Sequence, residues 1–214
     1  MLNGFDSSGR GAARRALSAL LLALVLVLTS GAGGCLFAPR GAEPPASGNV
    51  VQYLPRLSAA AVMENLDKAL RARDAIGYMD QIGETFHYVP DGQTTTEYPG
   101  VDWPNWNYAQ EQVFITALFN NTDAIAASLR EVVIFDGEGA TAVEWEFIYS
   151  LGVTSPGSAQ PTPYRGRAFF KLALEGSFWK LTEWRDVQGE ADPVSGATLP
   201  TAGSLRGALT AGGG

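Results

Sequence analysis

The sequence predicts an α+β domain in which N-terminal helices pack on a curved antiparallel sheet. Residues 58–83 repeat apolar side chains at three- and four-residue spacing, as amphipathic helices do. Residues 128–187 instead alternate apolar and polar side chains in short segments separated by turns, which is typical of a meander of four strands. Because the helices precede the strands, the sheet is expected to form a second layer that wraps around them.

The helical part contains recognisable start signals. Ser58 is expected to cap a first helix with Val62, Leu66 and Leu70 on its buried stripe. Asp74 is expected to cap a short second helix that ends by residue 83.

A long loop separates this part from the next helix. A short strand over 85–89 is expected to stop at Pro90, and a helix is expected over 107–119. The intervening loop carries Tyr98, Trp103 and Trp106. A loop as long as residues 90–106 is usually functional or disordered, and three large aromatic residues argue against disorder.

The last two strands are expected to form a hairpin over 167–187 with a tight turn at Gly176-Ser177. A two-residue turn sets the pairs Leu174 with Trp179, Leu172 with Leu181, and Phe169 with Trp184. If alternation continues without interruption, Glu183 and Arg185 point inward, toward the helices. The mostly polar outer face would then hold Lys171, Lys180, Thr182 and Asp186, together with Phe169 and Trp184.

The N-terminus has the layout of an export signal. A basic segment ends at Arg15, an apolar run of about 13 residues covers 16–28, and small residues lead to Cys35. This run is shorter than the roughly 20 residues that a spanning helix needs. The stretch Ala32-Gly33-Gly34-Cys35 resembles the lipobox of bacterial lipoproteins, with Ala32 where leucine is usual.

This resemblance implies that Cys35 is lipidated and becomes the first mature residue. The alternative is a free cysteine after an ordinary cleavage site. Leu36, in place of an aspartate, favours the outer membrane by the same resemblance, facing the periplasm. The expected organisation is a signal peptide (1–34), the lipidated cysteine with a flexible tether (35–55), a folded domain (56–188) and a low-complexity C-terminal tail (189–214), of which Leu205 and Leu209 could pack on the domain.

Charge and composition exclude several functions. The charged residues of the first 34 positions are Arg10, Arg14, Arg15 and Asp6. The rest of the chain, residues 35–214, holds 12 Lys and Arg against 21 Asp and Glu, a net charge of −9. Such a surface argues against binding nucleic acid. One His and one Cys make a zinc or haem site improbable, so no metal and no cofactor are predicted.

Residues 58–187 resemble the nuclear transport factor 2-like superfamily, which includes ketosteroid isomerases and polyketide cyclase-like proteins. The resemblance rests on Glu64-Asn65-Leu66 through Arg71 with Asp74 and Tyr78, on Phe86-His87-Tyr88 with Pro90-Asp91, and on Phe178-Trp179-Lys180-Leu181 with Trp184-Arg185-Asp186. It implies a cone-shaped domain whose pocket binds small apolar molecules in many members, and whose outer sheet face often forms dimers. The residues expected at this pocket are Tyr78, His87, Trp103, Trp106, Tyr149, Glu183 and Arg185.

Only general acid–base chemistry remains open as a catalytic function, because neither a nucleophile beside a base nor a phosphate-binding glycine loop is evident. The candidate groups are Asp80, His87 and Glu183, with Tyr149, Tyr78 or Tyr88 as partners. Each has a structural alternative. Asp80 could be a surface or capping carboxylate, His87 a structural histidine, and Glu183 with Arg185 an ion-paired rim, while Trp103 and Trp106 could simply pack on the core.

Three functional hypotheses follow. The first is a membrane-tethered lipoprotein of the bacterial cell envelope that binds a small apolar ligand or a partner protein and is not catalytic. The alternative is a cyclase- or isomerase-like acid–base enzyme acting on an apolar substrate. The third is a homodimer through the outer sheet face around Phe169 and Trp184.

Overall fold

A computed structural model of the chain describes residues 51–135 and 140–212. The predicted signal peptide, Cys35 and the predicted tether as far as residue 50 lie outside these residues, as do residues 136–139. The compact unit starts at Val51 and continues to the C-terminus. In this described part, no helix has the length and apolar composition needed to cross a membrane.

The first two helices begin where the sequence predicts. Helix α2 (Ala59–Ala72) starts after Ser58, whose side chain accepts a hydrogen bond from the backbone N–H of Ala61. Helix α3 (Ala75–Gln81) starts after Asp74, which accepts one from Gly77. Each bond satisfies one of the backbone donors that a helix start leaves free.

The aromatic-rich loop contains helical segments that the sequence did not predict. It contains helix α4 (Gly92–Glu97) and the 3-10 helix η1 (Trp103–Asn105). Helix α5 (Tyr108–Asn120) follows, with a capping box formed by Asn107 and Gln110.

The sheet has five strands in the order β1-β5-β4-β3-β2. Their bounds are β1 (Ile82–Val89), β2 (Ala124–Phe135), β3 (Ala142–Thr154), β4 (Thr162–Glu175) and β5 (Phe178–Gly189). Strands β2 to β5 form the predicted antiparallel meander, whereas β1 pairs with β5 in parallel and makes the sheet mixed. The predicted α+β class and the curved sheet covered by helices are confirmed.

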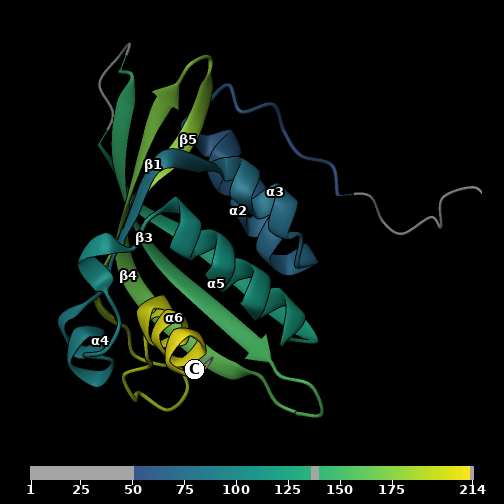
Figure 1. Cartoon of the computed structure of the whole chain (residues 1–214), viewed down its shortest axis with the longest axis vertical. Coiled ribbons are helices and arrows are strands. Elements are labelled where there is room, and N and C mark those ends of the chain that lie inside the picture. Colours follow the sequence, from purple (N-terminus) through teal and green to yellow (C-terminus); the bar gives the residue numbers. More distant parts are fainter. Residues whose placement is uncertain (1–50, 136–139, 213–214) are drawn as a thin grey trace, which may run out of the picture. The chain divides into compact units, whose positions relative to one another are not determined.

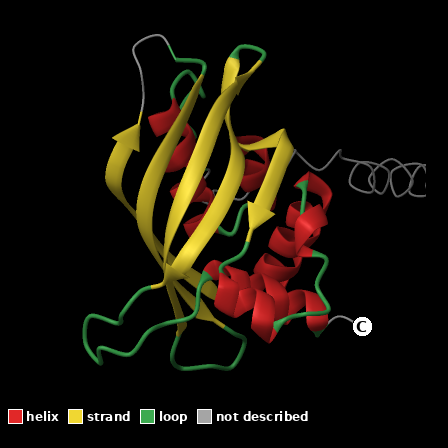
Figure 2. Ribbon diagram, turned by 90° about the vertical axis from the view of Figure 1, so that its left-hand side faces the viewer, coloured by secondary structure: helices red, strands yellow, loops and turns green. Residues whose placement is uncertain are grey.

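Figures 1 and 2 show α2, α3 and α5 gathered on one side of the strongly twisted sheet. We call the space between this inner sheet face and the helices the cone. On β3, Val143, Trp145, Phe147 and Tyr149 alternate inward, with Glu144 and Glu146 outside. Helices α2 and α5 cover the other side of the core with Leu66, Leu70, Ile115 and Leu118.

The C-terminal segment is part of this core. Helix α6 (Ala202–Ala211) is capped by Thr201, and its residues 202–207 are all buried. In Figure 1 it lies beside α5 and β4 in yellow. The folded domain therefore extends past residue 188, and Leu205 packs on it as the sequence suggested.

Candidate functional site

The hairpin contains a β-bulge that decides which side chains enter the cone. The predicted pairs Leu174–Trp179 and Leu172–Leu181 are present, but Lys171 opposes Glu183, so Thr182 is an extra residue on β5. The Thr182 hydroxyl donates a hydrogen bond to the carbonyl of Lys171 at this point. Because one extra residue inverts the alternation, the side chains that follow on β5 exchange faces.

Two predictions about β5 are therefore wrong. Phe170, not Phe169, opposes Trp184, and Trp184 is buried inside the cone instead of lying on the outer face. Glu183 and Arg185 lie on the outer face, where Arg185 Nη2 is 3.3 Å from Glu144 Oε1 and its guanidinium covers the Phe169 ring.

His87 also lies outside the cone. Its side chain is 51% exposed, and its Nε2 lies 3.3 Å from Glu183 Oε2. Asp80, 53% exposed at the end of α3, pairs with Arg56 at 3.1 Å. The acid–base hypothesis required a buried and unpaired group, and none of Asp80, His87 and Glu183 is one.

The bulge brings Asp186 into the cone, although the sequence pattern placed it on the polar face. One of its carboxylate oxygens accepts hydrogen bonds from Tyr149 Oη and Trp184 Nε1, each at 2.9 Å. The other accepts them from the Tyr88 hydroxyl and from the backbone N–H of Gly203 at 3.2 Å. Asp186 thus joins the sheet to the first turn of α6.

A second carboxylate, that of Glu111 on α5, is held from three directions. Tyr78 Oη donates to Oε1 at 2.6 Å, and Trp106 Nε1 donates to Oε2 at 2.8 Å. Arg206 on α6 donates from Nη2 to Oε1 at 2.6 Å and from Nε to Oε2 at 3.0 Å. The Arg206 and Glu111 side chains are 1% and 0% exposed, so this two-point ion pair is excluded from water.

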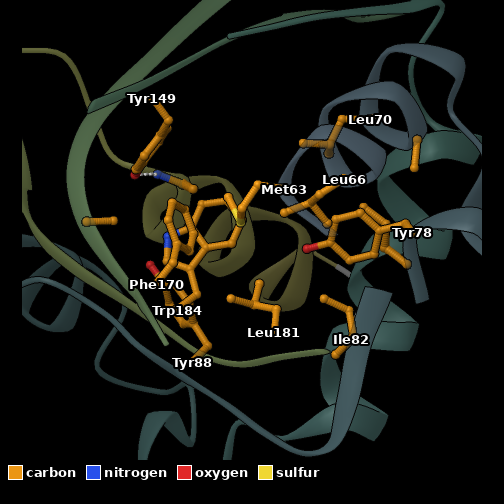
Figure 3. Close-up of a cluster of buried hydrophobic side chains, with 14 of the residues drawn as sticks. Met63, Leu66, Leu70, Tyr78, Ile82, Tyr88, Tyr149, Phe170, Leu181 and Trp184 are labelled. Carbon is orange, nitrogen blue, oxygen red and sulfur yellow. Dashed lines mark hydrogen bonds between the residues drawn. The ribbon is translucent and has the colours of Figure 1, made fainter. Parts of the chain in front are cut away.

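Aromatic rings surround the same guanidinium. Arg206 Cζ lies 4.1 Å from the ring centroid of Tyr88, 4.5 Å from that of Trp184 and 4.7 Å from that of Phe114. These are favourable cation–π distances. Figure 3 shows Tyr88, Tyr149, Phe170 and Trp184 on the sheet side of this core, facing Leu66, Leu70 and Tyr78 of the helices.

The pKa directions follow from this burial. Burial alone would lower the pKa of Arg206, but the Glu111 carboxylate outweighs it and raises that pKa above its ordinary value. Burial raises the pKa of Asp186, opposed by the Tyr88 hydrogen bond and the charge of Arg206. Burial, followed by the neighbouring carboxylates, also raises the pKa of the Tyr78, Tyr88 and Tyr149 hydroxyls. The cone therefore holds its arginine charged and its tyrosines neutral.

The remaining pocket candidates are all buried. Tyr78 and Tyr149 line the cone as donors to Glu111 and Asp186. Trp106 does so too, while Trp103 stacks on it with ring centroids 5.3 Å apart and donates to the carbonyl of Tyr98. Each of these four polar groups already has a partner within the protein.

A polar clasp fixes α6 to α4. Asp91, which is almost completely buried, accepts hydrogen bonds from the hydroxyls of Thr201 at 2.6 Å and Thr94 at 2.7 Å. It also accepts hydrogen bonds from the backbone N–H groups of Gln93 and Thr94, and so caps α4. Although burial alone would raise the pKa of Asp91, these hydrogen bonds lower it.

An open groove of about 900 Å³ lies outside the cone. Its walls come from α3, β1, α5 and the β4–β5 turn, and include Ile76, Met79, Tyr108 and Lys180. Of the candidate site residues predicted from the sequence, Asp80 lines it. In the part of the chain that the structure describes, no group of His, Cys, Asp or Glu side chains is arranged to hold a metal ion.

Sequence reasoning missed Glu111, Asp186 and Arg206. Arg206 had a usable signal, since it is a single cation in a Gly- and Ala-rich segment with Thr201 as a helix start and Leu205 and Leu209 at helical spacing. Asp186 gave none, because a β-bulge has no reliable signature in an alternating segment.

Solved structures share this fold. A candidate scytalone dehydratase from Novosphingobium aromaticivorans aligns with a TM-score of 0.51 at 8% identity, over 66% of this chain and 89% of that one. A candidate aromatic ring hydroxylase from the same organism gives 0.50 at 18% identity, over 62% and 87%. A conserved protein of Planctomyces limnophilus gives 0.50 at 13% identity, over 60% and 91%. No protein-family model and no curated protein sequence matches the chain.

Proposed function

From the nuclear transport factor 2-like fold that this chain has, we propose that it is a non-catalytic binding module, tethered to the bacterial cell envelope by lipid on Cys35. The fold includes both ligand-binding proteins and isomerase or dehydratase enzymes, so the fold does not choose between them. The contents of the cone support a binding role without catalysis.

The observation that carries the proposal is that a helix of the chain itself occupies the cone. Arg206 fills the space between Glu111 and three aromatic rings, and the hydrogen-bonding groups around it are paired. A general acid or base must reach a substrate proton, and these carboxylates instead reach α6. The centre of the cone also carries an ion pair and not an apolar surface, which favours a polypeptide segment over a small apolar molecule as the bound partner.

The tether is supported by the sequence alone. About 0.8 kcal/mol per buried methylene allows two or three acyl chains on Cys35 to hold the domain to a bilayer without any help from its fold. By the lipobox resemblance, Leu36 favours the periplasmic face of the outer membrane.

Native mass spectrometry of the full-length protein purified from its own membranes tests the binding function. We expect a partner polypeptide to be retained, and the Cys35→Ser variant to leave the membrane fraction. Purification without any partner contradicts the binding function, and a Cys35→Ser variant that stays in the membrane contradicts the anchor.

A second candidate function is acid–base catalysis by Asp186 after α6 leaves. The observation in its favour is the raised pKa of this carboxyl, which burial causes, beside the Tyr88 and Tyr149 hydroxyls. This arrangement would suit an isomerase- or cyclase-like reaction on an apolar substrate. Turnover of a steroid or polyketide-like probe that the Asp186→Asn variant loses would support it, and absence of turnover with and without α6 contradicts it.

A further inference from the structure

The cone contains a binding site for a planar cation, which we call the seat. It consists of the Glu111 carboxylate and the rings of Tyr88, Phe114 and Trp184, none of which belongs to α6. Tyr78 donates to one oxygen of Glu111 and Trp106 donates to the other, and both donors are buried. Each oxygen therefore stays aimed at the cone by a neutral donor from α3 or from the residue that ends η1. Neither donor belongs to α6, so both would still hold the Glu111 oxygens without the guanidinium.

The walls of the seat favour a guanidinium over an ammonium group. Tyr88, Trp184 and Phe114 present three rings within 4.7 Å of Arg206 Cζ. A planar guanidinium can stack on such rings while it donates two parallel hydrogen bonds to one carboxylate, whereas an ammonium group is a point charge with a stronger hold on water.

Helix α6 is a short element whose structure depends on its contacts with the rest of the domain. Residues 190–201 connect it to β5 and contain the isolated bridge between Ala191 and Thr198. They also contact β4 through Arg165, whose N–H donates to the Pro200 carbonyl at 2.9 Å and whose carbonyl accepts from the Glu190 N–H at 3.0 Å. A helix of 10 residues is not stable alone in water, so α6 depends on its seat for its structure. Its buried side is short, because residues 208–212 are exposed or half-buried.

The seat also restricts the residues beside the arginine. A Cβ atom added to Gly203 would lie 2.6 Å from Tyr88 Oη, and one added to Gly207 would lie 2.4 Å from the Tyr98 ring. A segment that replaces α6 therefore needs glycine three residues before its arginine and glycine directly after it.

We propose that the cone is a receptor for the guanidinium group of an arginine, which Arg206 occupies in cis and which the arginine of a Gly-x-x-Arg-Gly segment of a partner protein occupies when α6 leaves. The inference rests on the proposed binding function and names the chemistry of the partner. Free guanidino compounds share this chemistry, and the experiment separates the two sources.

The first arm is chemical rescue of the full-length Arg206→Ala variant. Loss of the buried cation should lower the thermal unfolding midpoint by about 10 °C, and millimolar methylguanidinium should restore most of that loss. Methylammonium has the same charge but cannot donate two parallel hydrogen bonds from one plane, so it should not restore the unfolding midpoint. The control is Arg71→Ala, whose exposed side chain pairs with Asp67 on the same helix and which should respond to neither ion.

The second arm uses a full-length Gly203→Val/Gly207→Val variant, in which α6 no longer fits its seat. A peptide of residues 198–212 should bind this variant and raise its unfolding midpoint, and the same peptide with Arg206→Ala should not. If methylguanidinium rescues Arg206→Ala but the peptide does not bind Gly203→Val/Gly207→Val, the natural ligand is a small guanidino compound. That result would overturn the proposal of a partner segment.

Failure of methylguanidinium to rescue Arg206→Ala, or equal rescue by methylammonium, overturns the inference as a whole. A partner retained in native mass spectrometry would then leave the proposed binding function intact.

Discussion

The guanidinium of Arg206 and the carboxylate of Glu111 form a two-point ion pair inside the cone, although the residues are 95 positions apart in the chain. Arg206 comes from the last helix and Glu111 from the helix that crosses the sheet. The pair therefore connects the C-terminal segment to the centre of the core.

Replacing Arg206 with Met keeps most of the side-chain volume and leaves Glu111 buried with two neutral donors. Removing one partner of a buried pair costs about 3–5 kcal/mol, because the other charge loses its compensation. We expect a loss of this size in the free energy of unfolding by urea. Arg71→Met, which removes an exposed pair on α2, should change it by less than about 1 kcal/mol. Equal losses in the two variants would contradict the buried pair.

The β-bulge at Thr182 predicts opposite effects for adjacent residues on β5. Trp184 points into the cone, so Trp184→Ala should cost about 3–5 kcal/mol by leaving a cavity. Arg185 lies on the outer face, so Arg185→Ala should cost less than about 1 kcal/mol. Urea unfolding of both variants measures the difference. The reverse order would support uninterrupted alternation and a different register.

Asp91 should make stability depend on pH through the clasp between α4 and α6. Its pKa is lowered from the ordinary value of 3.8, because the hydrogen bonds that it accepts outweigh its burial. The folded state thus favours the ionised form, and this stabilisation is complete above pH 3.8 and is lost as pH falls through the lowered pKa. The difference in unfolding free energy between wild type and Asp91→Asn should therefore be largest near neutral pH and shrink below pH 3.8.

The comparison is a series of urea unfolding curves at decreasing pH. Asp186, whose pKa is raised, acts in the opposite sense, but it is present in both proteins and cancels in the difference. Glu64→Gln, which removes an exposed pair with Lys68, is the matched control and should show little difference at any pH. A difference for Asp91→Asn that grows on acidification would mean that the clasp carboxyl is protonated in the folded protein.

Gly203→Ala tests how closely α6 fits its seat. The new Cβ would meet Tyr88 Oη at 2.6 Å and Thr94 at 2.9 Å, so we expect a cost of about 1–3 kcal/mol from overpacking. A Cβ at Gly92, the first residue of α4, meets no atom within 4 Å. Gly92→Ala should therefore be neutral or slightly stabilising in thermal unfolding. Equal behaviour of the two variants would show that α6 does not occupy this position.

Much of the fold could be predicted from local signals. Ser58, Asp74 and Asn107 begin the helices as their side chains predict, because each accepts a backbone N–H that the helix start leaves free. The pairs Leu172–Leu181 and Leu174–Trp179 follow from the two-residue turn, since the turn sets the register beside it.

The site was harder to predict, because it depends on an interruption and on a distant segment. One extra residue at Thr182 moves the side chains of Glu183, Trp184 and Asp186 to the opposite face of the sheet. An alternating sequence is compatible with either face. The partners Glu111 and Arg206 meet only in three dimensions, and a single arginine among small residues is more typical of a solvated tail than of a core.

The central claim is that α6 closes the cone, and amide hydrogen exchange of the full-length protein tests it most directly. The N–H of Gly203, which donates to buried Asp186, and the helical N–H of Arg206 should exchange far more slowly than amides of an unstructured tail. Exchange of both amides at the rate of an unstructured tail, with β4 still protected, would contradict a cone closed by its own C-terminal helix.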